Sequence, residues 1–323
     1  MKRILTGIQS TGTPHLGNIL GAIQPAIEMA ENEKTSSYLF IADFHSLTQV
    51  KNAEVLRENS YQTAAAWLAC GLNPDKTVFY KQSSVPQVTE LTWYLMCFFQ
   101  YQRLTLAHSF KDKADRLSDV NAGLFNYPLL MAADILLYDA NEVPVGKDQL
   151  QHLEITRDIA NKINNHFQEE LLVVPEPNVR EETQIIPGID GVKMSKSKGN
   201  TINVFLPEKK LRKQIMRIET DSTPLEEPKD PHKCNVFSIF KCIGSKSETK
   251  DLAQKYRGGN FGYGHAKQAL FDLVLDKYKN ERDAFSQLLE DRPLIDRVLA
   301  KGALEATKTA HETLSRIRNK MGY

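Results

Sequence analysis

Three residues near the start of the chain have types and spacing suited to binding phosphate. His15, Gly17 and Asn18 lie in the segment Pro14-His15-Leu16-Gly17-Asn18, shortly after an apolar run. A glycine lets a ligand approach the backbone closely, and a helix beginning near Asn18 would offer free N–H groups and the positive end of its dipole. His15 can donate to a phosphate oxygen whether its imidazole is neutral or protonated. The alternative is an ordinary glycine turn in which Asn18 caps a helix.

A second segment, Lys193-Met194-Ser195-Lys196-Ser197, supplies two compact cations. Lysine carries its charge on a flexible stem, which suits it to follow a leaving pyrophosphate group. Gly191 and Gly199 flank the segment, so we expect a loop that closes over a ligand and reopens. The alternative is a solvated surface loop, the usual setting of lysine and serine.

The elements that must position these segments alternate between short apolar strands and longer helices. Strands are expected at residues 4–6, 38–42, 77–80 and 142–146, and helices at residues 19–29, 53–69, 121–138 and 147–167. This alternation predicts an α/β fold, a doubly wound parallel sheet with helices on both faces. Ligands bind such sheets beyond the carboxyl ends of the strands, so the loops after Thr6 and Ala42 are the first candidates for a site.

The composition of the chain changes near residue 200. Residues 175–201 are rich in proline, glycine and charge, which predicts a boundary, and residues 207–323 show helical patterns almost throughout. We therefore expect a catalytic domain over residues 1–200, an all-helical domain over residues 201–293, and a last helix within residues 294–323 that packs back on the first domain.

Composition excludes several classes of protein. The chain has 323 residues, of which 41% are hydrophobic and 25% charged, and its net charge of +1 gives no global attraction to nucleic acid. Its four cysteines form no CxxC pair, which argues against a zinc ribbon or a redox motif and fits a reducing compartment. Because the sequence has no signal peptide and no membrane-length apolar run, we expect a cytoplasmic protein without a membrane partner.

Together, the two phosphate-binding candidates resemble the paired HIGH and KMSKS signatures of class I aminoacyl-tRNA synthetases. Four further blocks, residues 6–9, 43–45, 127–136 and 143–152, are similar to bacterial tryptophanyl-tRNA synthetases. The resemblance covers essentially the whole chain and is densest in the first 200 residues. It implies a Rossmann-like class I catalytic domain followed by a helical domain that reads the tRNA anticodon.

The implied activity joins the carboxylate of L-tryptophan to the α-phosphate of ATP. It then transfers the tryptophanyl group to tRNA(Trp), with AMP and diphosphate as the other products. The carboxylate is ionised at pH 7, so the enzyme needs no general base and must position two anions and stabilise charge on the phosphates. The residues that the resemblance assigns to catalysis are His15, Asn18, Lys113, Lys193 and Lys196.

The resemblance places Asp134 against the indole N–H of tryptophan. An indole nitrogen only donates and a carboxylate only accepts, and the apolar neighbours of Asp134 also favour a functional acid over a solvated one. Tyr127 and Gln149 would hold the ammonium and carboxylate of the substrate, whereas His45 is either a ligand contact or a packed neighbour. The residues assigned to tryptophan are Gly7, His45, Tyr127, Met131, Asp134, Ile135, Val143, Val145 and Gln149.

The resemblance implies that ATP lies between the two signatures and a turn on its ribose side. Asp148 would face a ribose hydroxyl, Ile185 would lie against adenine, and Lys113 would reach the triphosphate. The residues assigned to ATP are Gln9, Ser10, Thr11, Gly17, Asn18, Gly146, Lys147, Asp148, Ile185, Lys193, Met194, Ser195, Lys196 and Ser197. Magnesium is expected with ATP, and no protein-bound metal or iron–sulfur site is expected.

The chain departs from the family pattern at several positions. Leu5 stands where an aromatic residue often flanks the indole, Lys147 replaces a common glutamate, and Lys198-Gly199-Asn200 follows the second signature. These changes leave Asp134 and the signature lysines intact.

The family implies a homodimer that binds tRNA(Trp) through its helical half. There Tyr256 or Phe261 would stack on bases, although solvated helix faces are an equally good interpretation of the charged residues. The basic residues expected to meet phosphates are Lys209, Lys210, Arg212, Lys213 and Arg217. The aromatic stretch of residues 93–101 would belong to the core or to a dimer interface. Two rival functions stay open: a tyrosine–tRNA ligase of the same architecture, and a non-catalytic paralogue that binds tRNA or tryptophan.

Overall fold

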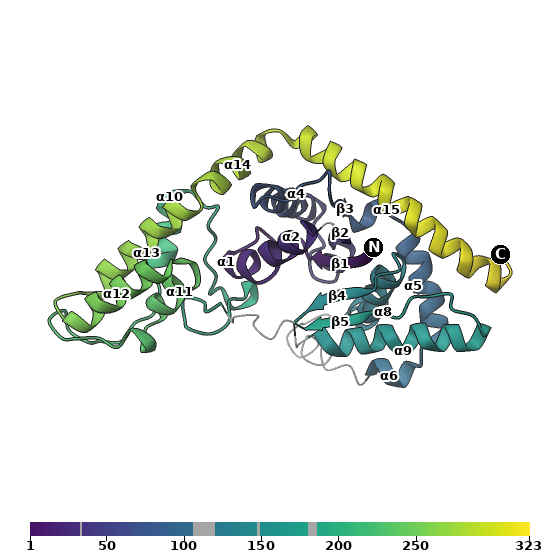
Figure 1. The fold of residues 1–323 in the computed structure, drawn as a ribbon, viewed down its shortest axis with the longest axis horizontal. Coiled ribbons are helices and arrows are strands. Elements are labelled where there is room, and N and C mark those ends of the chain that lie inside the picture. The colour runs from purple at the N-terminus through teal and green to yellow at the C-terminus, as the bar shows by residue number, and fades with distance from the viewer. Residues whose placement is uncertain (33, 106–119, 147–148, 180–185) are drawn as a thin grey trace.

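The expected doubly wound sheet is present in the computed structural model, which describes residues 1–32, 34–105, 120–146, 149–179 and 186–323. Five parallel strands of the described chain form one sheet in the order β3-β2-β1-β4-β5 (Figure 1). The strands are β1 (Lys2–Ile8), β2 (Thr35–Ile41), β3 (Val78–Lys81), β4 (Glu142–Val145) and β5 (Glu176–Val179). The α/β fold class predicted from the sequence is therefore confirmed.

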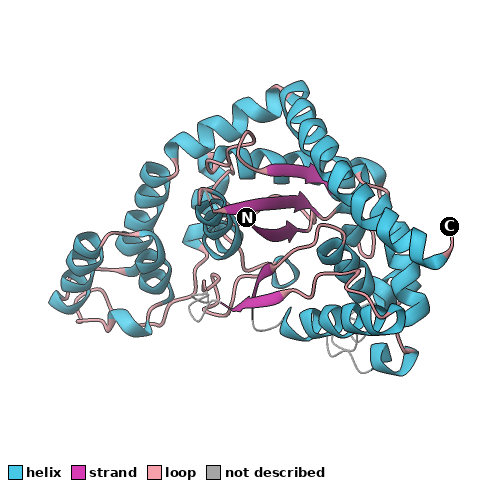
Figure 2. Ribbon diagram, turned by 45° about the vertical axis from the view of Figure 1, so that its right-hand side comes forward, coloured by secondary structure: helices cyan, strands magenta, loops and turns pink. Residues whose placement is uncertain are grey.

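Side chains of β2 show how the sheet is covered on both faces. Tyr38 and Phe40 pack into one apolar core, whereas the alternate residues Leu39 and Ile41 pack into another, because successive side chains of a strand point to opposite faces. Helices lie on either side of the strands (Figure 2). The helices on or beside the sheet are α1 (Leu16–Asn18), the π-helix η1 (Ile19–Ile23), α2 (Gln24–Ala30), α3 (Asp43–Ser46), α4 (Ala53–Ala69), the 3₁₀-helix η2 (Gln82–Ser84), α5 (Gln87–Phe98), α6 (Tyr101–Thr105), α8 (Ala122–Leu136) and α9 (Leu150–Phe167).

The strand order creates a switch point between β1 and β4. From β1 the chain passes to β2 and β3 on one side, and β4 and β5 are added on the other. Open parallel sheets bind ligands at such a point, beyond the carboxyl ends of the strands. The segments that follow β1, β2, β3 and β4 contain most of the candidate residues, so the fold gathers them at one edge.

The strand β5 was not anticipated from the sequence. Its residues lie in the segment interpreted as a boundary, because Pro177 and nearby glycines suggested a loop. Among the described residues, β5 pairs only with β4 and forms the edge of the sheet. A proline is tolerated in an edge strand since one side of that strand needs no ladder hydrogen bond.

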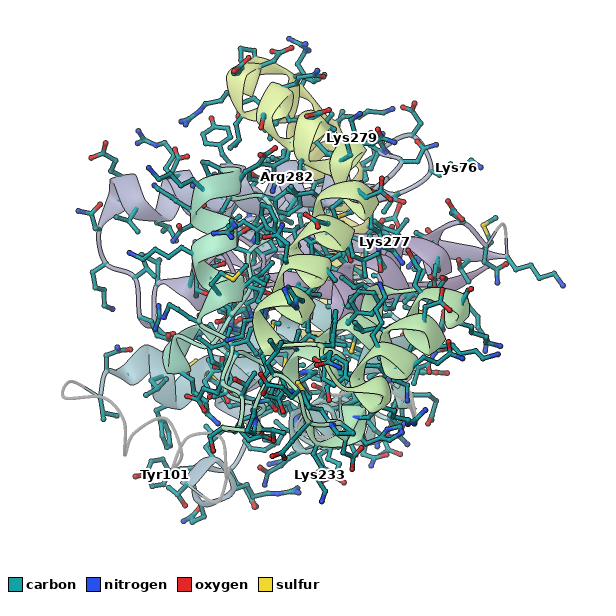
Figure 3. The ribbon with its side chains drawn as sticks, turned by 90° about the vertical axis from the view of Figure 1, so that its left-hand side faces the viewer. Lys76, Tyr101, Lys233, Lys277, Lys279 and Arg282 are labelled. Atoms are coloured by element: carbon teal, nitrogen blue, oxygen red, sulfur yellow. The ribbon has the colours of Figure 1, made fainter. Side chains whose placement is uncertain are left out.

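The C-terminal part of the chain is helical and continuous with one core of the sheet domain. Its helices are the 3₁₀-helix η4 (Lys196–Lys198), α10 (Glu208–Met216), the 3₁₀-helix η5 (Pro231–Lys233), α11 (Asn235–Ile243), α12 (Lys246–Gly258), α13 (Tyr263–Lys277), α14 (Lys279–Glu290) and α15 (Arg292–Met321). Arg282, labelled in Figure 3, donates to the backbone carbonyls of Val204 and, at 2.9 Å, Leu206. This arginine ties α14 to the segment that leaves the second signature.

Helix α15 returns to the sheet domain and runs along β3 (Figure 1). The approach is close at Gly302, where a Cβ would lie 1.9 Å from the carbonyl oxygen of Phe79. No helix in the described part of the chain is long and apolar enough to cross a membrane.

The proposed stacking of Tyr256 on RNA bases is wrong. Tyr256 is only 1% exposed, its hydroxyl lies 3.2 Å from Cys234 Sγ, and its ring packs against Phe237 and Phe261. Its position on α12 faces the core of the helical part, so the ring is unavailable to a base.

Candidate active site

His15 caps the short helix α1 and is neutral at pH 7. Its Nδ1 accepts from the backbone N–H of Asn18 at 3.3 Å, and Asn18 Oδ1 accepts from the backbone N–H of His15 at 3.1 Å. His15, rather than Asn18, is therefore the cap. Burial and the charge of Lys196 lower the pKa of His15 to about 4. Because Nδ1 is an acceptor, the single ring proton lies on Nε2 and can be donated to a ligand.

The two signatures meet in space. A Cβ on Gly17 would lie 3.0 Å from the His15 ring and 3.2 Å from Met194 Cβ. Lys196 Nζ donates to the carbonyl of Gly12 at 2.6 Å, in the loop after β1, and burial lowers its pKa to about 8. Lys193 is exposed. The arrangement brings together a neutral donor, a half-buried cation and a glycine that admits close approach.

Asn200 organises the second signature from beneath. It is 2% exposed, and its Oδ1 accepts from the backbone N–H of Ser195 at 2.7 Å. Its Nδ2 donates to Asp190 Oδ1 at 2.8 Å and to the carbonyl of Lys193 at 3.2 Å. This residue was noted in the sequence only as a departure from the family pattern, and its structural role was missed.

Asp134 lies in α8 at the centre of a buried polar cluster. It is 2% exposed, and its Oδ2 lies 2.9 Å from Nε2 of His45 in α3. Gln82 Nε2, in η2, lies 2.8 Å from Oδ1 and 2.9 Å from Oδ2. Burial raises the pKa of Asp134, while the hydrogen bonds from His45 and Gln82 oppose that rise. The cluster holds a carboxylate acceptor in an apolar helix.

Tyr127 and Gln149 are joined through His152. The Tyr127 hydroxyl lies 2.8 Å from His152 Nε2, and His152 Nδ1 lies 2.8 Å from Gln149 Oε1. Since the amide oxygen of Gln149 only accepts, Nδ1 carries the proton and Nε2 accepts from the tyrosine. The ring of Tyr127 also packs edge-on against the ring of His45, with 6.2 Å between the centroids. This contact joins the Tyr127–His152–Gln149 hydrogen bonds to the Asp134 cluster.

The remaining predicted residues fall into three groups. Ile135, Val143 and Val145 are buried apolar residues, and Met131 and Gly146 are half-buried. The backbone of Gly7 is exposed, and Gln9, Thr11 and Ser195 are half-buried, whereas Ser197 is exposed and Ser10 is fully buried. Ser10 Oγ lies 3.2 Å from Ser46 Oγ, so its hydroxyl faces the protein. The predicted residues that lie outside the described part of the chain are Lys113, Lys147, Asp148 and Ile185.

The geometry can be set beside known proteins. A model of the family described as tRNA synthetases class I (W and Y) matches residues 1–278. This chain belongs to that family. A tryptophan–tRNA ligase of Campylobacter jejuni is 46% identical over 320 residues, which cover 99% of this chain and 99% of that protein. A tryptophan–tRNA ligase of Fusobacterium nucleatum is 44% identical over 324 residues, covering 100% of this chain and 98% of that protein.

A solved structure is similar to this chain over nearly its whole length. The crystal structure of tryptophanyl-tRNA synthetase from Campylobacter jejuni, complexed with ADP and tryptophan, has a TM-score of 0.95 and 46% identity. The similarity covers 99% of this chain and 100% of that one.

Three functional candidates of this synthetase were missed from the sequence: Gln82, His152 and Asn200. The rule that ligands lie beyond the carboxyl ends of strands would have found Gln82, which directly follows β3. The described residues contain no group of three or more His, Cys, Asp or Glu side chains able to hold a metal ion. The site combines a neutral donor and a half-buried cation at the sheet edge with a buried acceptor cluster.

Proposed function

We propose that this chain is a tryptophan–tRNA ligase. It would activate L-tryptophan with ATP to tryptophanyl-adenylate and transfer the tryptophanyl group to tRNA(Trp), releasing AMP and diphosphate. The observation that carries this proposal is the buried Asp134, an acceptor for an indole N–H, at the same sheet edge as the paired signatures. The names of the similar proteins from Campylobacter jejuni and Fusobacterium nucleatum support it.

In the first step, a tryptophan carboxylate oxygen bonds to the α-phosphorus of ATP while the bond to the pyrophosphate oxygen breaks. No proton has to be removed from the nucleophile. We propose that His15 donates its Nε2–H to a phosphate oxygen and that Lys193 and Lys196 follow the pyrophosphate. The backbone N–H of Gly17 would add a donor, since a helix N-terminus favours anions.

Tryptophan would lie with its indole N–H on Asp134. The apolar walls would come from Met131, Ile135, Val143 and Val145, with Gly7 and His45 beside the ring. Tyr127 and Gln149 would hold the ammonium and carboxylate, and the His152 bridge supports a shared role by fixing both side chains.

ATP would occupy the signature side of the edge. Magnesium would enter with ATP as part of the substrate, since Mg²⁺ commonly binds through substrate phosphates rather than a protein cage. The remaining proposed ATP contacts are Gln9, Thr11, Gly146, Lys147, Asp148, Ile185, Met194, Ser195 and Ser197. Ser10 is not among them, because it is fully buried with its hydroxyl beside Ser46. Lys113 stays a proposed triphosphate contact.

The helical part would bind the anticodon of tRNA(Trp). The side chains of Lys209, Lys210, Arg212, Lys213 and Arg217 are exposed on or just after α10, where they can reach phosphates. We also propose a homodimer. Trp93 and Tyr101, the latter labelled in Figure 3, are 62% and 67% exposed. An apolar hollow of about 580 Å³ is lined by Phe44 of α3, Thr89 and Thr92 of α5, and residues of α8. With ATP and tRNA as substrates, the reaction would take place in the cytoplasm.

Amino-acid-dependent exchange of labelled pyrophosphate into ATP tests the proposal directly. We expect exchange with tryptophan and, at equal concentrations, roughly 10⁴-fold less with tyrosine, because its single ring leaves the apolar walls unfilled and cannot place a donor where the indole N–H would lie. Exchange driven by tyrosine alone would assign the chain to a tyrosine ligase. Tryptophan binding without exchange would assign it to a non-catalytic paralogue.

A further inference from the structure

Gln82 is a buried residue that connects three elements of the amino-acid side. It begins η2 directly after β3 and is 1% exposed. Its Nε2 contacts both carboxylate oxygens of Asp134, at 2.8 and 2.9 Å. Its Oε1 accepts from the backbone N–H of Phe44 at 3.1 Å, in α3. One side chain therefore joins η2 to both α3 and α8.

The partners of Gln82 determine which way its amide faces. A backbone N–H only donates and an ionised carboxylate only accepts, so Oε1 faces Phe44 and Nε2 faces Asp134. A second link holds the same joint, because Asp43 Oδ1 accepts from the backbone N–H of Ser83 at 2.9 Å and Oδ2 accepts from its hydroxyl. Gln82 is thus fixed at both ends of its amide without a ligand.

The contacts of Asp134 leave room for one more donor. A carboxylate has about four acceptor positions. Within the described residues, His45 contacts Oδ2, and Gln82 shares its donor between Oδ2 and Oδ1. Oδ1 therefore has only the shared Gln82 contact, and an indole N–H can be added there without displacing either partner.

We propose that Gln82 is a positioning residue for amino-acid selectivity, which orients the Asp134 carboxylate so that Oδ1 accepts the indole N–H. This inference rests on the proposed function. Gln82 acts through Asp134 and the proposal requires no contact between Gln82 and the substrate.

The ionisation of Asp134 depends on its hydrogen-bond donors. Burial raises its pKa, as does the nearby charge of Asp43, whereas the hydrogen bonds from His45 and Gln82 lower it. The hydroxyls of Tyr80 and Tyr138 also lie within electrostatic range of Asp134. Loss of the Gln82 donor raises the pKa of Asp134 further, so a protonated carboxyl, a poorer acceptor, becomes more populated as the pH falls.

The test uses an analogue that lacks the indole N–H. Gln82→Met keeps the length of the side chain and removes its donor. In pyrophosphate exchange, we expect kcat/KM for tryptophan to fall about tenfold to a hundredfold, because a buried hydrogen bond to a charged group is lost. For β-(benzothiophen-3-yl)alanine, in which sulfur replaces the N–H, the loss should stay within about threefold. The tryptophan-to-analogue ratio therefore falls, with KM for ATP unchanged.

The pH dependence separates positioning from simple loosening of the fold. For Gln82→Met, the rise of kcat/KM for tryptophan with increasing pH should lie at higher pH than in the unsubstituted protein, because the pKa of Asp134 is raised further. Ser83→Ala is the matched control, since it removes the hydroxyl link to Asp43 and keeps the donor to Asp134; its selectivity ratio should stay unchanged. Should Gln82→Met not fold, Gln82→Asn withdraws the amide by one methylene and gives the same comparison.

Two outcomes would overturn the inference: equal losses for tryptophan and the analogue, or the same change of ratio in Ser83→Ala. Failure of the proposed function is distinguishable, because the unsubstituted protein would then show no tryptophan-dependent exchange at all.

Discussion

The nucleotide side of the site is held largely by main-chain atoms, whereas its amino-acid side is held by side chains that bind one another. On the first side, Lys196 rests on the carbonyl of Gly12, and the backbone N–H of Leu16 donates to the carbonyl of Ile202 at 2.8 Å. On the second, Asp134, His45 and Gln82 form a cluster whose members are almost fully buried.

This difference suits the two tasks. A loop held by a few separate hydrogen bonds, each with a net value of about 0.5–1.5 kcal/mol, can open for ATP and pyrophosphate at little cost. A buried polar network is costly to break, because every member left without a partner keeps its desolvation penalty. Mobility therefore belongs to the side that handles phosphates, and rigidity to the side that selects the amino acid.

Asp134→Ala should impair the amino-acid side of the site and leave the nucleotide side intact. It removes the acceptor for the indole N–H and leaves the donors of His45 and Gln82 buried without a partner. We expect kcat/KM for tryptophan to fall about a thousandfold, corresponding to about 4 kcal/mol. Steady-state pyrophosphate exchange measures this loss. KM for ATP should change less than about twofold, since no hydrogen bond within the described residues joins the nucleotide side to the cluster.

Comparable losses for tryptophan and ATP would show that Asp134 serves the whole fold rather than one half of the site. Thermal unfolding of the same variant distinguishes that case, because a loss of fold would also lower the unfolding temperature below the assay temperature.

Asn200→Ala should impair the nucleotide side of the site and leave the amino-acid side intact. The variant leaves the backbone N–H of Ser195 and the carbonyl of Lys193 without the side chain that pairs them. We expect single-turnover adenylate formation to slow about tenfold, since the loop loses about 1–2 kcal/mol of positioning. Binding of tryptophan, followed by intrinsic fluorescence quenching or calorimetry, should be unchanged.

Asp190→Asn is the matched control for this variant. It keeps an acceptor facing Asn200 Nδ2 at the half-buried end of the same hydrogen bond. Its adenylate rate should stay within about twofold of the unsubstituted rate, because the hydrogen bond to Asn200 is retained with a neutral acceptor. A tenfold loss in the control, or weaker tryptophan binding in Asn200→Ala, would remove the separation between the two sides.

The same contrast explains what the sequence could predict. The alternation of apolar runs was enough for the parallel sheet, most clearly at β2, where residues 38–41 are buried on both faces and form a continuous apolar segment. The edge strand β5 escaped, since pairing with β4 overrides the local signal of Pro177. The signatures were visible because their chemistry lies in adjacent residues.

The amino-acid side was harder to predict because its members are distant in the sequence. Gln82 and Asp134 are 52 residues apart, and His45 and Asp134 are 89 apart. Asp134 stood out as an acid among apolar neighbours, whereas Gln82 is marked only by its place directly after β3. Likewise, helical periodicity places Tyr256 on a helix without showing that its face is buried. In both cases, tertiary packing determines where the side chain lies.

The smallest expected effect is a pH dependence confined to the nucleotide side. Burial lowers the pKa of Lys196 to about 8, so its ammonium loses its proton as the pH rises through that value in the free enzyme. From pH 7 to pH 8.5, kcat/KM for ATP should fall about fourfold, because kcat/KM reports the free enzyme. His15 stays neutral over this range since its pKa is about 4. At saturating ATP, bound phosphate keeps Lys196 protonated, so kcat/KM for tryptophan should stay constant over this pH range.

Lys196→Arg, whose guanidinium remains charged, should abolish the alkaline fall of kcat/KM for ATP. If the fall persists in Lys196→Arg, or appears equally for tryptophan at saturating ATP, the titrating group is not Lys196 and the two sides are not electrostatically separate.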